Sequence, residues 1–204
     1  MCIRDSADAG PTHYITEDFA CMRSVLNLNI YTLSDASSAK RLANKLLDEP
    51  ELCYVRFDRH EQPELPVTNF TQDLTYRLMG DTVTSKKVLV IGSGKMSHLI
   101  ADAYKENSDK IVGVDLIRAK PFPNTLNILL EECGGAIVID EQTPCGSLGA
   151  AVLEAMSERD SLNKKVKVIT LPEEYLFENG GRDYLLKKHG LSKENIVKTL
   201  NDNF

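Results

Sequence analysis

The second half of the chain alternates short apolar runs with stretches that have helical periodicity. Residues 87–91, Lys-Val-Leu-Val-Ile, form a run typical of a strand buried in a parallel sheet. Similar runs, each of which predicts a strand, occupy residues 111–116, 136–140 and 166–170. Helices are predicted at residues 96–105, 123–130, 148–156 and 182–188, and in a last segment capped by Ser192. This alternation predicts a three-layer α/β/α domain over residues 86–204.

Residues 7–66 show a shorter version of the same pattern. A helix is predicted from Thr16, as its cap, to residue 24, and residues 28–33 alternate apolar and polar positions as a strand does. A second helix begins at Ser34 or Asp35, and residues 52–57 form the next strand. This order predicts parallel pairing. Because two strands do not make a stable sheet, the segment is interpreted as half of a domain.

Two segments lie outside these patterns. Residues 60–85 contain prolines, a glycine and polar clusters, and we interpret them as an interdomain connection, with the linker itself at residues 67–85. Within it, residues 70–78 are expected to pair as an antiparallel strand. Residues 1–6 (MCIRDS) have neither the apolar core nor the cleavage pattern of a signal peptide. We interpret them as a non-native leader on an N-terminally truncated reading frame.

Composition narrows the classes of function. The 204 residues are 42% hydrophobic and 26% charged, and the net charge is −6. That charge argues against a nucleic-acid partner, which usually needs a basic face. No apolar run approaches the ~20 residues that a membrane helix needs, so no membrane partner is expected. The five cysteines include no CxxC pair, which predicts free thiols in the reducing cytoplasm and no zinc site.

One glycine motif offers a chemistry of its own. Gly92-Ser93-Gly94 follows a predicted strand and opens a predicted helix, as a dinucleotide-binding loop does. Asp115 ends the next strand, where a ribose-binding acid would sit. However, Ser97 stands in place of the third glycine, and a tight strand–helix turn needs glycine whatever it binds. A nicotinamide-binding protein is therefore an alternative interpretation.

The order of short motifs along the chain resembles that of the transketolase family. Landmarks of the C-terminal domain of that family are matched by Val90-Ile91-Gly92-Ser93-Gly94, residues 114–123, Ile139-Asp140-Glu141-Gln142, residues 146–152 and His189-Gly190-Leu191. Upstream, Gly10-Pro11-Thr12-His13 resembles the Gly-Pro-Thr-His motif of transketolases and 1-deoxyxylulose-5-phosphate synthases. The resemblance implies an α/β fold. Residues 7–66 would be the C-terminal half of a parallel-sheet pyrimidine-binding domain, and residues 86–204 the three-layer transketolase C-terminal domain.

The same resemblance implies roles for two residues. His13 falls on the histidine that contacts the sugar substrate in the family, as a catalytic and substrate-binding residue, and a neutral imidazole both donates and accepts hydrogen bonds. Arg59 falls at a strand end where the family has an arginine for the substrate phosphate, which a guanidinium matches bidentately. Arg56 is the alternative for that role. The alternative for Arg59 is a surface ion pair with Asp58 or Glu61.

Other polar residues receive structural roles. Glu17 and Asp18 are expected to offset the dipole of the first helix, and Glu141 and Cys145 are expected to be structural. Ala9 precedes the glycine of the Gly-Pro-Thr-His motif, where transketolases have an acid that reads the donor sugar. The identity of the sugars therefore stays open.

The activity implied by the resemblance is the transfer of a two-carbon ketol unit between sugar phosphates. It would need thiamine diphosphate and Mg²⁺, held outside this chain, so the chain alone is expected to be inactive. The implied partners are a sugar-phosphate substrate and an N-terminal thiamine-diphosphate-binding domain or subunit, in a homodimer or heterotetramer. Alternatives are a 1-deoxyxylulose-5-phosphate synthase, a 2-oxo acid dehydrogenase component, and a non-catalytic assembly or dimerisation module.

Overall fold

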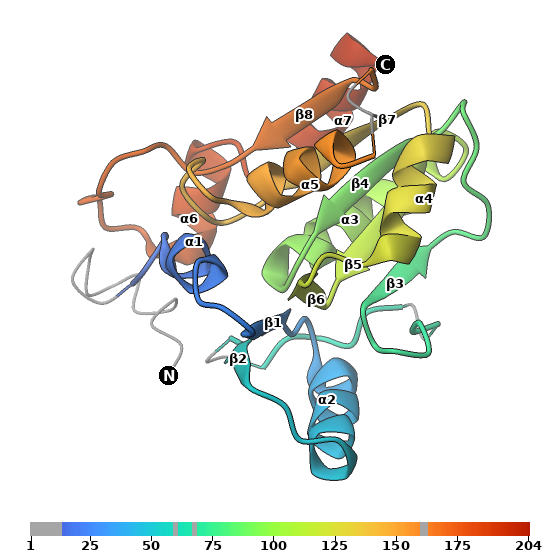
Figure 1. The fold of residues 1–204 in the computed structure, drawn as a ribbon. Coiled ribbons are helices and arrows are strands. Elements are labelled where there is room, and N and C mark those ends of the chain that lie inside the picture. Colours follow the sequence, from blue (N-terminus) through green and yellow to red (C-terminus); the bar gives the residue numbers. More distant parts are fainter. Residues whose placement is uncertain (1–13, 59–60, 67–68, 160–162) are drawn as a thin grey trace.

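The computed structural model describes residues 14–58, 61–66, 69–159 and 163–204. The predicted leader at residues 1–6, the Gly10-Pro11-Thr12-His13 motif and Arg59 lie outside the described residues. The described residues form two β-sheets, one of five strands and one of three, together with helices (Figure 1). The predicted α/β class is confirmed.

The larger sheet has the strand order β3-β5-β4-β7-β8. Its parallel strands are β4 (Val88–Gly92), β5 (Ile111–Leu116), β7 (Gly135–Ile139) and β8 (Val166–Ile169). Every residue of β4, β5 and β7 is buried, which explains the continuous apolar runs in the sequence. β3 (Tyr76–Met79) pairs antiparallel with β5, so the antiparallel strand expected in this region is confirmed.

One face of the larger sheet is covered by α3 (Lys95–Asn107) and α7 (Lys193–Asn203). Ile100 of α3 and Ile196 of α7 are fully buried in one cluster with Val90 of β4. Ridges of apolar side chains at helical spacing therefore face the sheet, as the periodicity predicts.

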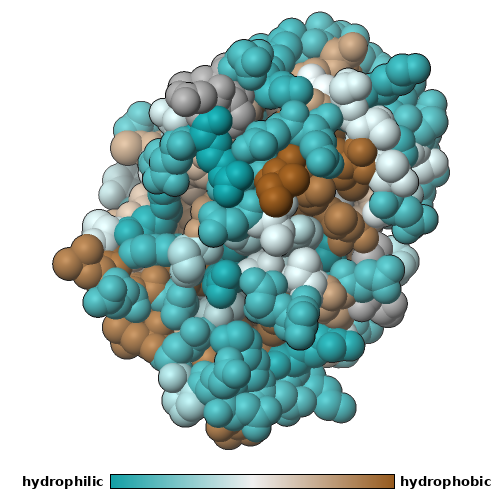
Figure 2. Space-filling view, turned by 45° about the vertical axis from the view of Figure 1, so that its right-hand side comes forward, coloured by the Kyte–Doolittle hydropathy of each residue, from teal (hydrophilic) through white to brown (hydrophobic). Residues whose placement is uncertain are grey.

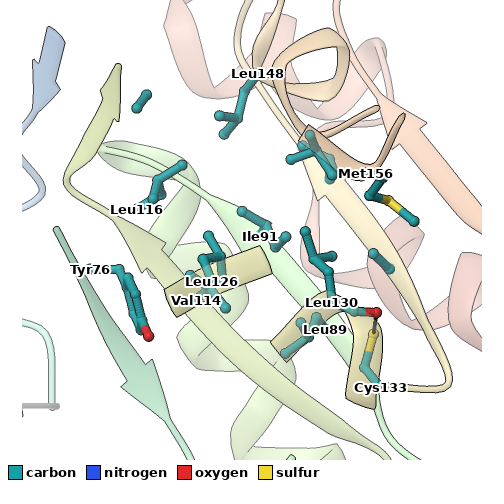
Figure 3. Packing of buried hydrophobic residues seen from close by; sticks show 14 of the residues in the cluster. Tyr76, Leu89, Ile91, Val114, Leu116, Leu126, Leu130, Cys133, Leu148 and Met156 are labelled. Carbon is teal, nitrogen blue, oxygen red and sulfur yellow. Dashed lines mark hydrogen bonds between the residues drawn. The ribbon is translucent and has the colours of Figure 1, made fainter. Parts of the chain in front are cut away.

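The opposite face is covered by α4 (Asn124–Glu132) and α5 (Leu148–Ser157), which completes three layers. Figure 3 shows side chains of these helices meeting those of the strands. The cluster includes Leu89, Ile91, Val114, Leu126, Leu130, Leu148 and Met156. Alternate residues along each strand point to the two faces, so neighbouring strand residues enter different clusters.

The smaller sheet has the order β2-β1-β6 and lies at the end of the molecule that carries α2 (Figure 1). β1 (Asn29–Thr32) and β2 (Cys53–Arg56) pair in parallel, as the sequence predicts. β6 (Arg118–Lys120) pairs antiparallel with β1 and is not predicted, because three residues with two charged side chains show no strand periodicity. The strand that follows β5 in the sequence thus joins the sheet formed by β1 and β2, which belong to the N-terminal segment, residues 14–66.

Two helices of the N-terminal segment begin differently from each other. α2 (Ala36–Asp48) begins after Asp35, whose side chain accepts a hydrogen bond from the third helical N–H in a capping box. Of the two caps that the sequence allowed, Ser34 and Asp35, the structure has Asp35. α1 (Asp18–Arg23) has Glu17 at its N-cap with no side-chain cap. The predicted cap by Thr16 is wrong, because its hydroxyl instead donates to the Glu17 carboxylate at 2.9 Å.

Hydrophilic residues cover most of the face shown in Figure 2, and hydrophobic residues form separate patches on it. Five of the exposed large hydrophobic residues belong to the N-terminal segment: Val25, Leu26, Leu47, Leu52 and Phe57. Within the part of the chain that the structure describes, no helix is both long enough and apolar enough to cross a membrane.

Candidate functional site

The two residues that the sequence predicts for the site, His13 and Arg59, lie outside the described residues. Their neighbours along the chain, Tyr14 and Asp58, are described: Asp58 is bonded to Arg182, and Tyr14 lines the same pocket as Arg182. Tyr14 precedes α1, and Asp58 follows the end of β2. The structure therefore brings close together the residues that are adjacent in sequence to His13 and Arg59.

Arg182 lies in the first turn of α6 (Gly181–Lys188) and bridges two carboxylates. Its Nε donates to Oε1 of Glu141 at 2.7 Å and its Nη2 donates to Oε2 at 2.5 Å, while its Nη1 donates to Asp58. The side chains are only 14%, 11% and 7% exposed for Arg182, Glu141 and Asp58. Burial by itself lowers the pKa of Arg182, but the two carboxylates outweigh it and the pKa is raised. Glu141 is thus held in a structural ion pair.

Tyr14 lies beside this ion pair. Its hydroxyl donates to the carbonyl of Leu176, and burial raises its pKa. Tyr14 and Arg182 line the same pocket, whose volume is about 40 Å³. A cavity needs roughly 10–15 Å³ for one water molecule. The pocket therefore has room for a few waters and is too small for a sugar phosphate. It is a gap between packed segments of the chain and does not enclose a substrate.

Arg56, the alternative phosphate-binding arginine, takes part in a buried ion pair. Its Nε and Nη2 donate to the two oxygens of Asp18 at 2.8 and 3.3 Å, and its Nη1 donates to the Thr32 hydroxyl at 3.1 Å. The Arg56 side chain is 2% exposed and lies over the ring of Phe19. This geometry disfavours Arg56 as a phosphate ligand. It also gives Asp18 a structural partner.

Asp115 is fully buried and its oxygens are occupied. Oδ1 accepts hydrogen bonds from the hydroxyls of Ser34 at 2.5 Å and Ser97 at 2.6 Å, and Oδ2 pairs with the guanidinium of Arg77 at 2.7 Å. Ser97, which replaces the third glycine of a dinucleotide fingerprint, thus holds Asp115 inside the protein. Such an acid does not face a ribose.

The glycines of the same loop are needed for packing. A Cβ at Gly92 would lie 2.8 Å from Cδ1 of Ile100. Gly94 has a φ of +57°, and a Cβ there would lie 3.1 Å from Cγ2 of Thr32. The loop between β4 and α3 therefore packs against the helix that follows it and against β1. Together with the buried Asp115, this packing disfavours the nicotinamide-binding alternative.

The described residues do not fit a Mg²⁺–diphosphate site. Among the residues that the structure covers, no group of three or more His, Cys, Asp or Glu side chains lies together as metal ligands would. The carboxylates at positions 18, 35, 58, 115 and 141 are each paired with an arginine, and buried Asp140 accepts a hydrogen bond from the N–H of Leu148 at 2.9 Å. Arginine pairing leaves these oxygens poorly suited to a hard cation.

Sequence reasoning missed the role of Arg182. It predicts a helix near residues 182–188, which α6 confirms, but no partner for the arginine at its start. The only local signal is the Gly180-Gly181 pair that precedes Arg182. The ion pair joins residues 124 positions apart, so no pattern along the chain reveals it.

Comparison with known proteins places the chain among transketolase-type sequences. Residues 82–196 match the family described as "Transketolase, C-terminal domain". The chain is 27% identical over 194 residues to one subunit of the apulose-4-phosphate transketolase of Phocaeicola vulgatus, covering 93% of this chain and 61% of that protein. It is 24% identical over 198 residues to the "1-deoxy-D-xylulose-5-phosphate synthase" of Nitrosomonas europaea, covering 96% of this chain and 31% of that protein.

The fold agrees with a solved structure described as "Split gene transketolase, inactive beta4 tetramer". The TM-score is 0.79 and the identity 23%, and the match covers 94% of this chain and 62% of the other. This chain therefore spans about three fifths of the split-type relatives that it matches and less than a third of the synthase.

Proposed function

The chain belongs to the transketolase C-terminal domain family, and from this premise we propose that it is part of a transketolase-like enzyme. The proposed reaction transfers a two-carbon ketol unit between sugar phosphates. The relatives support this reaction class, since one is named as a transketolase subunit and another as a 1-deoxy-D-xylulose-5-phosphate synthase. The donor and acceptor sugars are left open by Ala9.

Two residues carry the proposed chemistry of this chain. His13 contacts the sugar and exchanges a proton with it, as an imidazole that both donates and accepts hydrogen bonds is able to do. Arg59 binds the terminal phosphate through its guanidinium. The observation that carries this proposal concerns the neighbours of these two residues: Asp58 is bonded to Arg182, and Tyr14 lines the same pocket as Arg182. The bond from Arg182 to Asp58 further supports the phosphate role, because it occupies one of the two acids named in the alternative of a surface ion pair with Arg59.

We propose that thiamine diphosphate and Mg²⁺ are held by an N-terminal domain or partner subunit, as the family resemblance implies; among the described residues no group of three or more His, Cys, Asp or Glu side chains could hold a metal ion. β2 lies at the end of the strand order, and a groove of about 440 Å³ runs between its end and α2. Apolar side chains such as Leu42, Val55 and Phe57 line this groove. A strand at the edge of the sheet beside an apolar groove supports a further polypeptide segment at this position.

The proposed assembly is a homodimer or a heterotetramer with that N-terminal subunit. The proposed compartment is the cytoplasm. The cysteines at positions 21, 53, 133 and 145 are all free, which supports a reducing environment.

The test uses the complete enzyme, made from the chain with its upstream coding region and its partner subunit, and supplied with thiamine diphosphate and Mg²⁺. The His13→Ala substitution is expected to lower kcat for ketol transfer by about 10²–10⁴-fold, because a positioned proton-transfer group contributes that much. Arg59→Gln is expected to raise KM for a phosphorylated sugar, with little effect on its unphosphorylated analogue.

His189→Ala is the matched control, because that imidazole lies at the end of α6 and is expected to leave the rate unchanged. Ketol-transfer rates that are the same for His13→Ala and wild type would remove His13 from the mechanism. No turnover in the complete wild-type enzyme would support the alternative of a non-catalytic assembly module.

The second candidate is 1-deoxy-D-xylulose-5-phosphate synthesis. It is favoured by the match to the Nitrosomonas europaea protein, which extends over 96% of this chain. Assay of the same complete enzyme for formation of 1-deoxy-D-xylulose 5-phosphate separates the two candidates, because a ketol-transferring enzyme would not release that product.

A further inference from the structure

We propose that Arg182 is a positioning residue, which fixes residues 14–16 and residues 57–58 relative to each other. The inference rests on the proposed function, in which these segments lead to His13 and Arg59. Arg182 belongs to α6, far along the chain from both, and it lies where the three parts meet.

The first contact through which Arg182 acts is its direct hydrogen bond to Asp58. Nη1 of Arg182 donates to Oδ1 of Asp58, and the carboxylate is 7% exposed. A largely buried, charge-assisted hydrogen bond is stronger and better oriented than one at the surface. It therefore fixes the chain just beyond β2. Because consecutive Cα atoms are about 3.8 Å apart, a restraint at position 58 also limits where the next residue begins.

The second contact is indirect and passes through Glu141. Arg182 holds both carboxylate oxygens of Glu141, which precedes the loop at Gln142 and Thr143. The N–H of Thr143 donates to the carbonyl of Thr16 at 3.0 Å, and the side chain of Gln142 accepts from the N–H of Phe19 at 3.2 Å. Arg182 thus orients the loop that binds the segment after Tyr14.

A guanidinium is suited to this double task and an ammonium is not. Arg182 uses Nε and Nη2 for Glu141 and Nη1 for Asp58, so its planar group spans two acids in fixed directions. Lysine would keep the positive charge but would lose the bidentate geometry. Arg182→Lys should therefore keep only part of the restraint, whereas Arg182→Gln should keep almost none of it.

The experiment compares the chain as it stands with the variants Arg182→Gln, Arg182→Lys and Asp183→Asn. Asp183 is the matched control, because it lies next to Arg182 on α6 and pairs with Lys95 at the exposed surface. Backbone ¹⁵N NMR order parameters are measured for residues 14–16, for residues 57–58 and for β4. In Arg182→Gln, the order parameters of residues 14–16 and 57–58 are expected to fall from about 0.85 to below about 0.6, while those of β4 stay unchanged. Arg182→Lys should be intermediate, and Asp183→Asn should match the wild type.

Unchanged order in either segment of Arg182→Gln would overturn the proposal, and so would an equal loss of order in β4, which would indicate a general structural role. In the complete enzyme, Arg182→Gln should lower kcat/KM for a phosphorylated sugar by about 10-fold to 100-fold, since a displacement of about 1 Å has effects of this size. The NMR measurement requires no turnover. A failure of the proposed ketol transfer is therefore distinguishable from a failure of the role of Arg182.

Discussion

Replacement of Arg77 by methionine tests whether a buried ion-pair network holds the N-terminal segment to the larger sheet. Arg77 of β3 donates from Nη1 to Oδ2 of Asp35 at 2.8 Å and pairs with Asp115 of β5 at 2.7 Å. The Arg77 side chain is 1% exposed, and both carboxylates are fully buried. Methionine fills much of the same volume without a charge. The substitution therefore leaves two carboxylates buried without their counter-charge.

The expected cost is about 3–5 kcal/mol, because removal of one partner from a buried ion pair leaves an uncompensated charge. This is a large part of the roughly 5–15 kcal/mol that stabilises a typical domain. For a chain of this length, it corresponds to a fall in Tm of about 6–20 °C. The assay is urea unfolding followed by circular dichroism, with Arg159→Gln as control. Arg159 pairs with Glu131 at the surface, so the control should lose less than about 1 kcal/mol.

The pH dependence gives a second check. Burial by itself raises the pKa of Asp35, but hydrogen bonds from Arg77 and from the N–H groups of Ser38 and Leu65 outweigh it and lower the pKa. A lowered pKa stabilises the fold above the unfolded value of about 3.9, and this contribution is lost as the pH falls through the folded pKa. Without Arg77 the pKa of Asp35 rises, so the variant loses less than the wild type on acidification.

The stability difference between wild type and Arg77→Met should therefore be largest at pH 7 and should narrow toward pH ~4. A difference below about 1 kcal/mol at pH 7, or one that does not change with pH, would refute the argument that Arg77 neutralises these buried acids.

The described contacts predict two other outcomes. Asp18→Ala removes the partner of buried Arg56 and should lower the free energy of unfolding by about 3–5 kcal/mol in urea titrations; a loss below about 1 kcal/mol would contradict the buried pair. Iodoacetamide at pH 8 should label exposed Cys21 and Cys145 quickly and buried Cys133 slowly, because burial raises the pKa of the Cys133 thiol; equal labelling in peptide mass spectra would disprove this.

The fold could be predicted to a large extent from local patterns. Apolar runs mark β4, β5 and β7 because these strands are buried on both faces. The helix starts at Asp35 and Ser192 are readable because a cap bonds to an N–H only three residues away. A local capping signal fails where another group competes for the capping side chain. The Thr16 hydroxyl donates to the carboxylate of Glu17 and does not cap α1.

The candidate site was predicted less completely. The family motif indicates His13 and Arg59, both outside the described residues, and no pattern indicates that Arg182 connects the chain beside them. β6 was missed for a related reason, because its identity as a strand depends on β1, which precedes it by almost ninety positions and lies beside it only after folding.

The sequence by itself determined the α/β class, the order of the main elements and the family, since hydrophobic periodicity, caps and motifs act over a few residues. Only the tertiary structure decided which charged groups pair. Arg77 reaches Asp35 and Asp115 across 42 and 38 positions, and Arg182 reaches Asp58 across 124. The energy of an ion pair depends on distance and burial in space. Neither distance nor burial can be read from the order of residues along the chain.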